Sequence, residues 1–227
     1  MSPLDNVIWN ALCTSHADRG RGNHLARRYH PEFARFAGMP ELSDAGLRAL
    51  AADMPHDEVV AMSEAHDFDP GPWFDVAERK NLVQMIGPAT GDAQAPQRFR
   101  PLGADDVPRM TALVQATAPG PWFDRTSELG RFLGFEEDGR LVAMVGERMR
   151  VPGHTEISAV CCHPDWRGRG LAADLIRLVS QAIVARGEVP FLHVIAENDS
   201  AIALYEKLGL RRRLQSRLTI LRRNSRH

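Results

Sequence analysis

The sequence predicts an α/β protein of two lobes, in which helices pack against a sheet. Its most informative segment places an apolar run at 157–162 before a glycine-bearing turn at 167–170, and an amphipathic helix follows. A polar stretch at 92–96 is typical of a linker, so we expect a first lobe at residues 1–95 and a second lobe at residues 96–227. The length of 227 residues and an apolar content of 44% leave room for both.

The first lobe is predicted to be the smaller α/β unit. Apolar periodicity and short β-branched runs predict helices at 4–13 and 44–53, and strands at 58–62 and 81–86. The tetrapeptide Arg19-Gly20-Arg21-Gly22 follows no predicted strand, so we expect a turn or an exposed basic loop there. The lobe contains no second cofactor motif, and we expect it to serve acceptor specificity or assembly.

The second lobe is predicted to combine a hairpin, a long helix and further strands. The predicted strands are 139–146, 155–162, 191–196 and 217–221, the first two joined at 151–154 as an antiparallel pair. In the helix after the glycines, Leu171, Leu175 and Val179 recur at four-residue steps, so one side packs on the sheet. Asp174 and Arg177 are expected to face solvent.

The glycine-bearing turn is suited to holding an anion. A helix start leaves backbone N–H groups unpaired and carries partial positive charge, which favours a phosphate. Gly168 and Gly170 keep side chains away from such an anion, while Arg167 and Arg169 add positive charge. The turn lacks the Gly-Lys-Ser/Thr ending of a Walker loop and the glycine spacing of a dinucleotide fingerprint. A glycine turn that only reverses the chain is the plainer alternative.

A second motif follows one helix and one strand later. Arg167, Gly170 and Ala172 fill the pattern Gln/Arg-x-x-Gly-x-Gly/Ala, and residues 198–209 fill Asn-x-x-Ala-x-x-Leu-Tyr-x-x-x-Gly, with Leu210 in place of the usual Phe. With these paired motifs, roughly residues 97–223 resemble the GCN5-related N-acetyltransferase (GNAT) superfamily, and look closest to its FR47-like branch.

The resemblance implies the GNAT fold, a mixed and mostly antiparallel sheet flanked by helices. In that fold the fourth and fifth strands splay apart, and the pantetheine arm of the donor lies between them. The smaller α/β N-terminal lobe precedes this fold, and a degenerate GNAT half there is an open alternative.

The resemblance also implies acetyl-CoA as the donor, bound as a co-substrate. The residues expected to bind it are Val160, Cys161, Cys162, Arg167, Gly168, Arg169, Gly170, Leu171, Ala172 and Asn198. Asn198 has a compatible structural role as the N-cap of the helix that follows it.

Acetylation of an amine in a ternary complex requires a proton acceptor, a site for the negative intermediate and an acid for the thiolate. Glu156 is the expected base, acting directly or through water, and Glu147 is its rival. Backbone N–H groups at 160–162 are expected to face the thioester oxygen. Tyr205, with an ordinary pKa of about 10, is expected to protonate the thiolate, as the tyrosine of the GNAT motif does.

Two alternatives stay open for the second lobe. Cys161 or Cys162 as a nucleophile would give a ping-pong route, although a strand directs the two side chains to opposite faces and buried cysteine is usually a small hydrophobe. A non-catalytic acyl-CoA-binding regulator would keep the glycine turn but has no need of Tyr205 and Glu156.

Composition and charge restrict the partners. No apolar run is long enough to cross a bilayer, no signal sequence opens the chain, and three cysteines suit a reducing compartment, so we expect a cytoplasmic protein. The nine histidines form no metal-binding spacing, so we expect no metal. The clusters at 211–213 and 222–223 fall on predicted strand and tail, so we expect no nucleic-acid partner. A homodimer is compatible with the sequence and is not required by it.

The acceptor is expected to be an amine on a small molecule or a peptide. Loops around residues 119–131 would select it. That region includes the second copy of a hexapeptide, Pro-Gly-Pro-Trp-Phe-Asp, found at 70–75 and 119–124. Each tryptophan is expected to pack on the other lobe or to line an acceptor groove.

Overall fold

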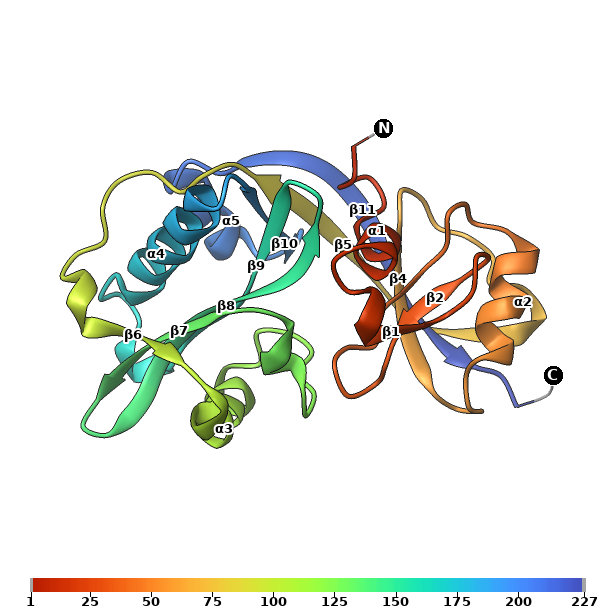
Figure 1. The fold of residues 1–227 in the computed structure, drawn as a ribbon, viewed down its shortest axis with the longest axis horizontal. Helices are drawn as coiled ribbons and strands as arrows, with labels where there is room; N and C mark the ends of the chain where they lie inside the picture. The colour runs from red at the N-terminus through yellow and green to blue at the C-terminus, as the bar shows by residue number, and fades with distance from the viewer. Residues whose placement is uncertain (1, 226–227) are drawn as a thin grey trace.

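The computed structural model describes residues 2–225, and one large sheet runs through both predicted lobes (Figure 1). In this described part, eight strands lie in the order β4-β11-β5-β10-β9-β8-β7-β6. Their bounds in that order are Val59–Glu64, Arg211–Arg223, Phe74–Ile86, Val189–Ile195, His154–Cys162, Arg140–Val151, Phe132–Glu137 and Phe99–Leu102. Neighbouring strands are antiparallel except β9 and β10, which are parallel. The prediction of a mixed, mostly antiparallel sheet flanked by helices is confirmed.

Helices cover both faces of this sheet. Their bounds are α1 Val7–Cys13, α2 Asp44–Ala52, α3 Val107–Thr117, α4 Leu171–Ala185 and α5 Asp199–Lys207. Consecutive strand residues point to opposite faces. Leu192 packs in the core under α4 and α5, whereas Phe191 packs in the core under α1. On β8, Val145 joins the first core and Met144 the core under α3. Helices α4 and α5 therefore share one face, and α1 and α3 lie on the other.

A small sheet and α2 complete the first lobe. The small sheet contains β1 Gly20–Gly22, β2 Arg27–Tyr29 and β3 Ala37–Gly38, in that order. The expected turn or loop at 19–22 is wrong, because Gly20–Gly22 pairs with β2 as an antiparallel strand. The predicted helix at 44–53 is confirmed as α2. Its N-cap is Ser43, whose hydroxyl accepts a hydrogen bond from the Gly46 N–H.

Strand β5 joins the two lobes. Residues 82–86 in its second half pair with β10 on one side and β11 on the other, while its first half pairs with β11 only. Beyond β11, β4 forms the next strand of the same sheet. In Figure 1, β5 and β11 run side by side as curved ribbons between the half of the molecule that contains α4 and α5 and the half that contains α2. Segments 1–95 and 96–227 thus share one sheet, and their separate roles stay predictions.

Strands β9 and β10 separate soon after they meet. Their pairing covers three positions and ends at Phe191 opposite Glu156. Farther along β9, the register with β8 shifts near Ala159, whose φ of 49° lies in the left-handed region. This bulge bends β9 away from β10, and alanine tolerates the conformation at some cost in backbone strain. The sheet therefore opens into a wedge beside residues 157–162.

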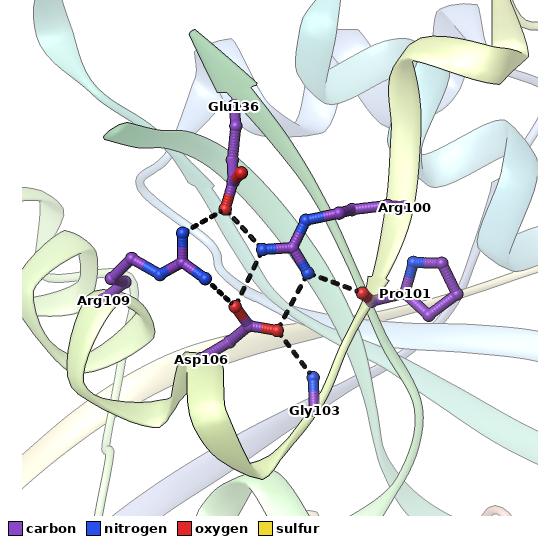
Figure 2. Close-up of polar contacts among 6 residues, drawn as sticks. All are labelled: Arg100, Pro101, Gly103, Asp106, Arg109 and Glu136. Carbon is purple, nitrogen blue, oxygen red and sulfur yellow. Dashed lines mark hydrogen bonds and ion pairs between the residues drawn. The ribbon is translucent and has the colours of Figure 1, made fainter. Parts of the chain in front are cut away.

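A charged cluster fixes the start of α3 to the sheet edge (Figure 2). The buried Asp106 carboxylate binds Arg100 at 2.8 and 2.9 Å, accepts the Gly103 N–H at 2.9 Å, and also binds Arg109. Glu136 on β7 pairs with both arginines. The hydrogen bond from Arg100, together with that from Gly103, holds the pKa of Asp106 well below its usual range. The cluster links β6, β7 and α3.

The expectation that each hexapeptide tryptophan packs on the other lobe is wrong for Trp122, while an acceptor groove beside either ring stays a prediction. The Trp122 indole N–H donates to Thr111 Oγ1 at 3.0 Å, and its ring lies edge-on against Phe132. Trp73 packs on the core around α2. Local packing therefore accounts for both rings.

Candidate active site

The glycine turn leads directly from β9 into α4, as predicted. Gly168 and Gly170 have φ angles of 77° and 79°, and a Cβ added at either position would meet nothing within 4 Å. Gly170 is the N-cap of α4, and its carbonyl accepts the first helical bond from the Asp174 N–H at 3.1 Å. The N–H groups at the start of α4 therefore have no intrahelical partner. The open space in front of them is suited to an anion.

A cleft of about 540 Å³ lies between this turn and α5. Its lining residues are Cys162, Trp166, Arg167, Gly168, Gly170, Leu171, Ala172, Ala173, Arg177, Leu204, Lys207 and Leu208. Six of the predicted donor-binding residues are among them. Val160, Cys161, Arg169 and Asn198 do not line the cleft, nor do Tyr205 and Glu156.

The cleft carries positive charge from two helices. Arg167, Arg177 and Lys207 line it, and no carboxylate does among the lining residues just named. Arg177 is fixed by its bonds to the Thr90 carbonyl and to Asp174, both at 3.0 Å. The expectation that Asp174 faces solvent is wrong, because its carboxylate is buried against the Arg177 guanidinium. Arg169 instead stacks over Trp166, 4.2 Å from the ring centre.

Arg177 and Lys207 were missed as cleft residues by sequence reasoning. Both are basic residues on amphipathic helices, a pattern that usually marks a solvated face. What brings them together is the packing of α5 beside the start of α4, which no local motif encodes.

The end of β9 presents backbone donors to the wedge. The His163 N–H donates to the Val142 carbonyl of β8 at 2.8 Å. Because backbone groups alternate sides along a strand, the Cys162 N–H points the other way, where β10 no longer pairs. A hydrogen-bond donor thus faces the wedge at a residue that also lines the cleft.

Tyr205 lies on the buried side of α5. It belongs to the core that also contains Leu171 and Leu175 of α4. Burial, reinforced by the neighbouring Cys161, raises the pKa of the Tyr205 phenol to about 12. The phenol therefore keeps its proton throughout the neutral range. Asn198 caps α5, and its Oδ1 accepts the Ala201 N–H at 3.1 Å.

Glu156 is fully buried at the last paired position of β9 and β10. Its carboxylate accepts two bonds from Arg148, at 2.7 and 2.8 Å, and one each from His193 Nδ1 at 2.7 Å and the Met149 N–H at 3.2 Å. Burial opposes ionisation, yet the charge and hydrogen bonds of Arg148 and the bond from His193 outweigh it. The pKa of Glu156 consequently lies far below its usual range.

The hydrogen bonds around His193 indicate which of its ring nitrogens donates to Glu156. Gln84 Oε1 accepts from Arg213 Nη1 at 2.8 Å, so Gln84 Nε2 is the donor toward the Leu4 carbonyl and toward His193 Nε2, both at 3.1 Å. His193 Nε2 is then an acceptor, and its proton sits on Nδ1 facing Glu156. Arg213 also pairs with Asp5, so the network extends from the first lobe to the strand separation.

The rival carboxylate and the two cysteines are also constrained. Glu147 is buried and pairs with Arg186 at 2.9 Å. Burial raises the pKa of Cys161 to about 11, and burial likewise raises that of the Cys162 thiol. Both thiols therefore stay protonated near neutrality, which disfavours attack by a thiolate. Among residues 2–225 no grouping of three or more His, Cys, Asp and Glu is arranged to hold a metal ion.

Comparisons with known proteins agree with this architecture. Residues 132–219 match the family described as FR47-like protein. A crystal structure from Novosphingobium aromaticivorans DSM 12444, assigned to the GNAT family, is 41% identical with a TM-score of 0.91, and the match covers 99% of this chain and 100% of that chain. The chain belongs to the GNAT superfamily, in its FR47-like branch.

Other proteins are similar over smaller parts or at lower identity. Acetyltransferases of Pectobacterium atrosepticum and Sodalis glossinidius are 37% and 38% identical, in matches that cover 39% of this chain and 68% of each relative. A GNAT structure from Kribbella flavida shares the fold at 16% identity and a TM-score of 0.61, covering 94% of this chain and 93% of that chain. Among residues 2–225 of this GNAT protein, no helix is long and apolar enough to span a bilayer.

Proposed function

We propose that the protein is an N-acetyltransferase that moves an acetyl group from acetyl-CoA to an amine in a ternary complex. The observation that carries this proposal is that the glycine turn, the end of β9 and α5 meet around one cationic cleft. Family membership and relatives named acetyltransferase support it.

The donor's phosphates are suited to the start of α4. Unpaired N–H groups after Gly170 and the partial positive charge of the helix start favour a pyrophosphate. Arg167, Arg177 and Lys207 add full charges at the rim. The apolar stretch formed by Leu171, Leu204 and Leu208 continues the cleft and is suited to the pantetheine arm.

The acyl chemistry is then expected at the strand separation. Attack of the amine nitrogen on the thioester carbon forms a C–N bond and places negative charge on the carbonyl oxygen. The Cys162 N–H is the proposed donor to that oxygen. As the C–S bond breaks, the Tyr205 hydroxyl gives its proton to the departing thiolate, the role predicted for it.

The amine's proton requires a different route from direct transfer to a carboxylate. Glu156 and Glu147 are both bound to arginines, and the pKa of Glu156 is strongly lowered. We therefore propose that water carries the proton away. Glu156 remains in the proposal as a positioning residue, because its carboxylate holds Arg148 and His193 beside the strand separation.

The test follows free thiol release from acetyl-CoA with four amine probes: spermidine, L-lysine, 2-phenylethylamine and triglycine. Wild-type protein is expected to release thiol with at least one probe, and Tyr205→Phe to lower kcat about 100-fold. Tyr29→Phe is the matched control, because Tyr29 is also buried but lies in the core under α1.

Two results would count against this assignment. Calorimetric CoA binding without turnover of any probe supports the acyl-CoA-binding regulator instead. An equal loss of kcat in both tyrosine variants removes Tyr205 as the acid.

A further inference from the structure

The loop between α3 and β7, residues 118–131, is attached to residues 32–36 of the first lobe. The Arg125 N–H donates to the Glu32 carbonyl, and the Thr126 hydroxyl donates to the Phe33 carbonyl, both at 2.8 Å. These are main-chain acceptors in a segment more than ninety positions earlier. The contact therefore depends on the main-chain conformation of both segments.

Thr126 is the centre of this attachment. Its side chain is buried, and Oγ1 also accepts the Phe123 N–H at 2.8 Å. One hydroxyl thus closes a turn in the loop and fixes that turn to Phe33. A buried hydroxyl with both functions satisfied has few alternative positions.

Aromatic contacts reinforce the attachment in both directions. The Arg125 guanidinium lies 4.3 Å from the centre of the Phe33 ring, and Arg35 lies 5.2 Å from that of Phe123. Leu129, which follows Thr126 in a short 3₁₀ turn, packs in the same core as Phe33. Each segment thus places an arginine guanidinium over a phenylalanine ring of the other. These two cation–π contacts hold the segments at a defined spacing.

The attachment continues to the strand separation. Phe36, in the same core as Phe33, lies under the Arg148 guanidinium at 5.0 Å. Arg148 in turn binds Glu156 where β9 and β10 part. A series of side-chain contacts therefore links loop 118–131 to the proposed site of acyl transfer.

The face of the sheet on which this attachment lies indicates which substrate it would meet. The donor cleft is built by α4 and α5, whereas α1, α3 and the core containing Phe33 and Leu129 lie on the opposite face. A thioester held from one face leaves the other face of the opened strands for the attacking amine.

We propose that residues 32–36 and loop 118–131 together form the acceptor-side wall of the active site, with Thr126 as the residue that positions the loop. This proposal rests on the proposed acetyl transfer. It gives the first lobe a direct part in acceptor recognition, because its main chain supplies the anchor for the loop.

The test compares Thr126→Val, which keeps the shape and removes the hydroxyl, with Thr126→Ser, which restores it. Thr219→Val is the matched control, since Thr219 is buried on β11 and its hydroxyl has no hydrogen-bond partner among the described residues. Hydrogen–deuterium exchange is measured on peptides covering 118–131 and 165–185. Initial rates are measured with whichever of the four amine probes turns over fastest.

We expect Thr126→Val to speed exchange in 118–131 alone and to raise the KM for the amine about tenfold, with the KM for acetyl-CoA unchanged. Thr126→Ser should return both values toward wild type. Unchanged exchange, an unchanged amine KM, or an equal rise in both KM values would overturn the proposal. If wild-type protein turns over no probe, the proposed activity fails separately, and exchange in 118–131 still decides whether Thr126 holds the loop.

Discussion

Glu156 and His193 face each other across β9 and β10 just where the two strands part, with Glu156 Oε1 2.7 Å from His193 Nδ1. The last paired residues are Glu156 and Phe191, so His193 is already two positions beyond the ladder. The side-chain bond therefore replaces the backbone pairing that the wedge removes. Arg148 neutralises the buried charge of Glu156. Together these side-chain contacts fix the position at which β9 and β10 separate.

Replacing this carboxylate should harm both stability and rate. Glu156→Gln leaves Arg148 buried without its counter-charge, so we expect the free energy of unfolding to fall by about 3 kcal/mol and kcat to fall as well. Denaturant unfolding and thiol release measure the two effects. Glu188→Gln is the control, because Glu188 is likewise an arginine-bound carboxylate, held by Arg150 and Arg186, but lies outside the strand separation. A kcat for Glu156→Gln equal to that of the control would contradict a catalytic part for Glu156.

The glycine turn offers a sharper test of donor binding. Gly170→Glu places bulk and negative charge in the open space before α4, so CoA affinity measured by calorimetry should fall by at least a hundredfold. Gly153→Glu is matched in backbone conformation, with φ of 75° and equally open surroundings, but lies in the β8–β9 turn. It should bind CoA as wild type does. Equal affinity in the two variants would remove the turn from the donor site.

The cluster of Figure 2 should contribute to stability without affecting donor binding. Asp106→Asn removes the charge that binds Arg100 and Arg109, and we expect a loss of about 2 kcal/mol, kept modest because both arginines are partly exposed. The neighbouring Asp105→Asn, at an exposed position, should change stability by less than about 0.5 kcal/mol. Chemical denaturation separates these outcomes, and equal losses would show that the cluster is not what holds α3.

His16 should make the fold sensitive to mild acid. It is buried with Nδ1 2.9 Å from the Tyr29 hydroxyl, and burial lowers its pKa from 6.5 to about 4. The unfolded chain therefore binds a proton before the folded chain does, and stability present above pH 6.5 is lost as the pH falls toward 4. The loss can reach about 3 kcal/mol.

Unfolding midpoints at pH 7.5 and 5.0 measure this linkage. The difference between the two should be larger for wild type than for His16→Gln, which cannot take up the proton. His66→Gln serves as the control, since His66 is exposed. Identical pH dependence in wild type and His16→Gln would show that other groups govern acid sensitivity.

Features encoded by neighbouring residues could be predicted from the sequence. The order of strand, glycine turn and helix predicts where the turn at Gly168 and Gly170 lies, because positive φ and helix capping are local requirements. The hairpin around Gly153 and the N-cap at Asn198 are local in the same sense. Of these elements, the glycine turn lines the cleft proposed for the donor.

Features that depend on distant segments could not be predicted. Gln84 meets His193 because β5 inserts beside β10, and an apolar run at 81–86 gives no indication of its partners. The ion pair of Glu156 with Arg148 depends on a register shift that sets two residues of β8 opposite one of β9. The sequence shows only that Glu156 starts the strand that leads to the glycine turn, which is why it is the expected base, and gives no sign of its pairing with Arg148.

The central place of β5 also bears on how the chain folds as it is synthesised. Leu82, Val83 and Met85 emerge early, yet their strand partners at 191–195 and 211–216 are made more than a hundred residues later. Closing so long a loop is slow, and the apolar strand remains unpaired meanwhile. We expect the nascent chain to need chaperone protection until its final strand is available, and the large sheet to form late and in a single step.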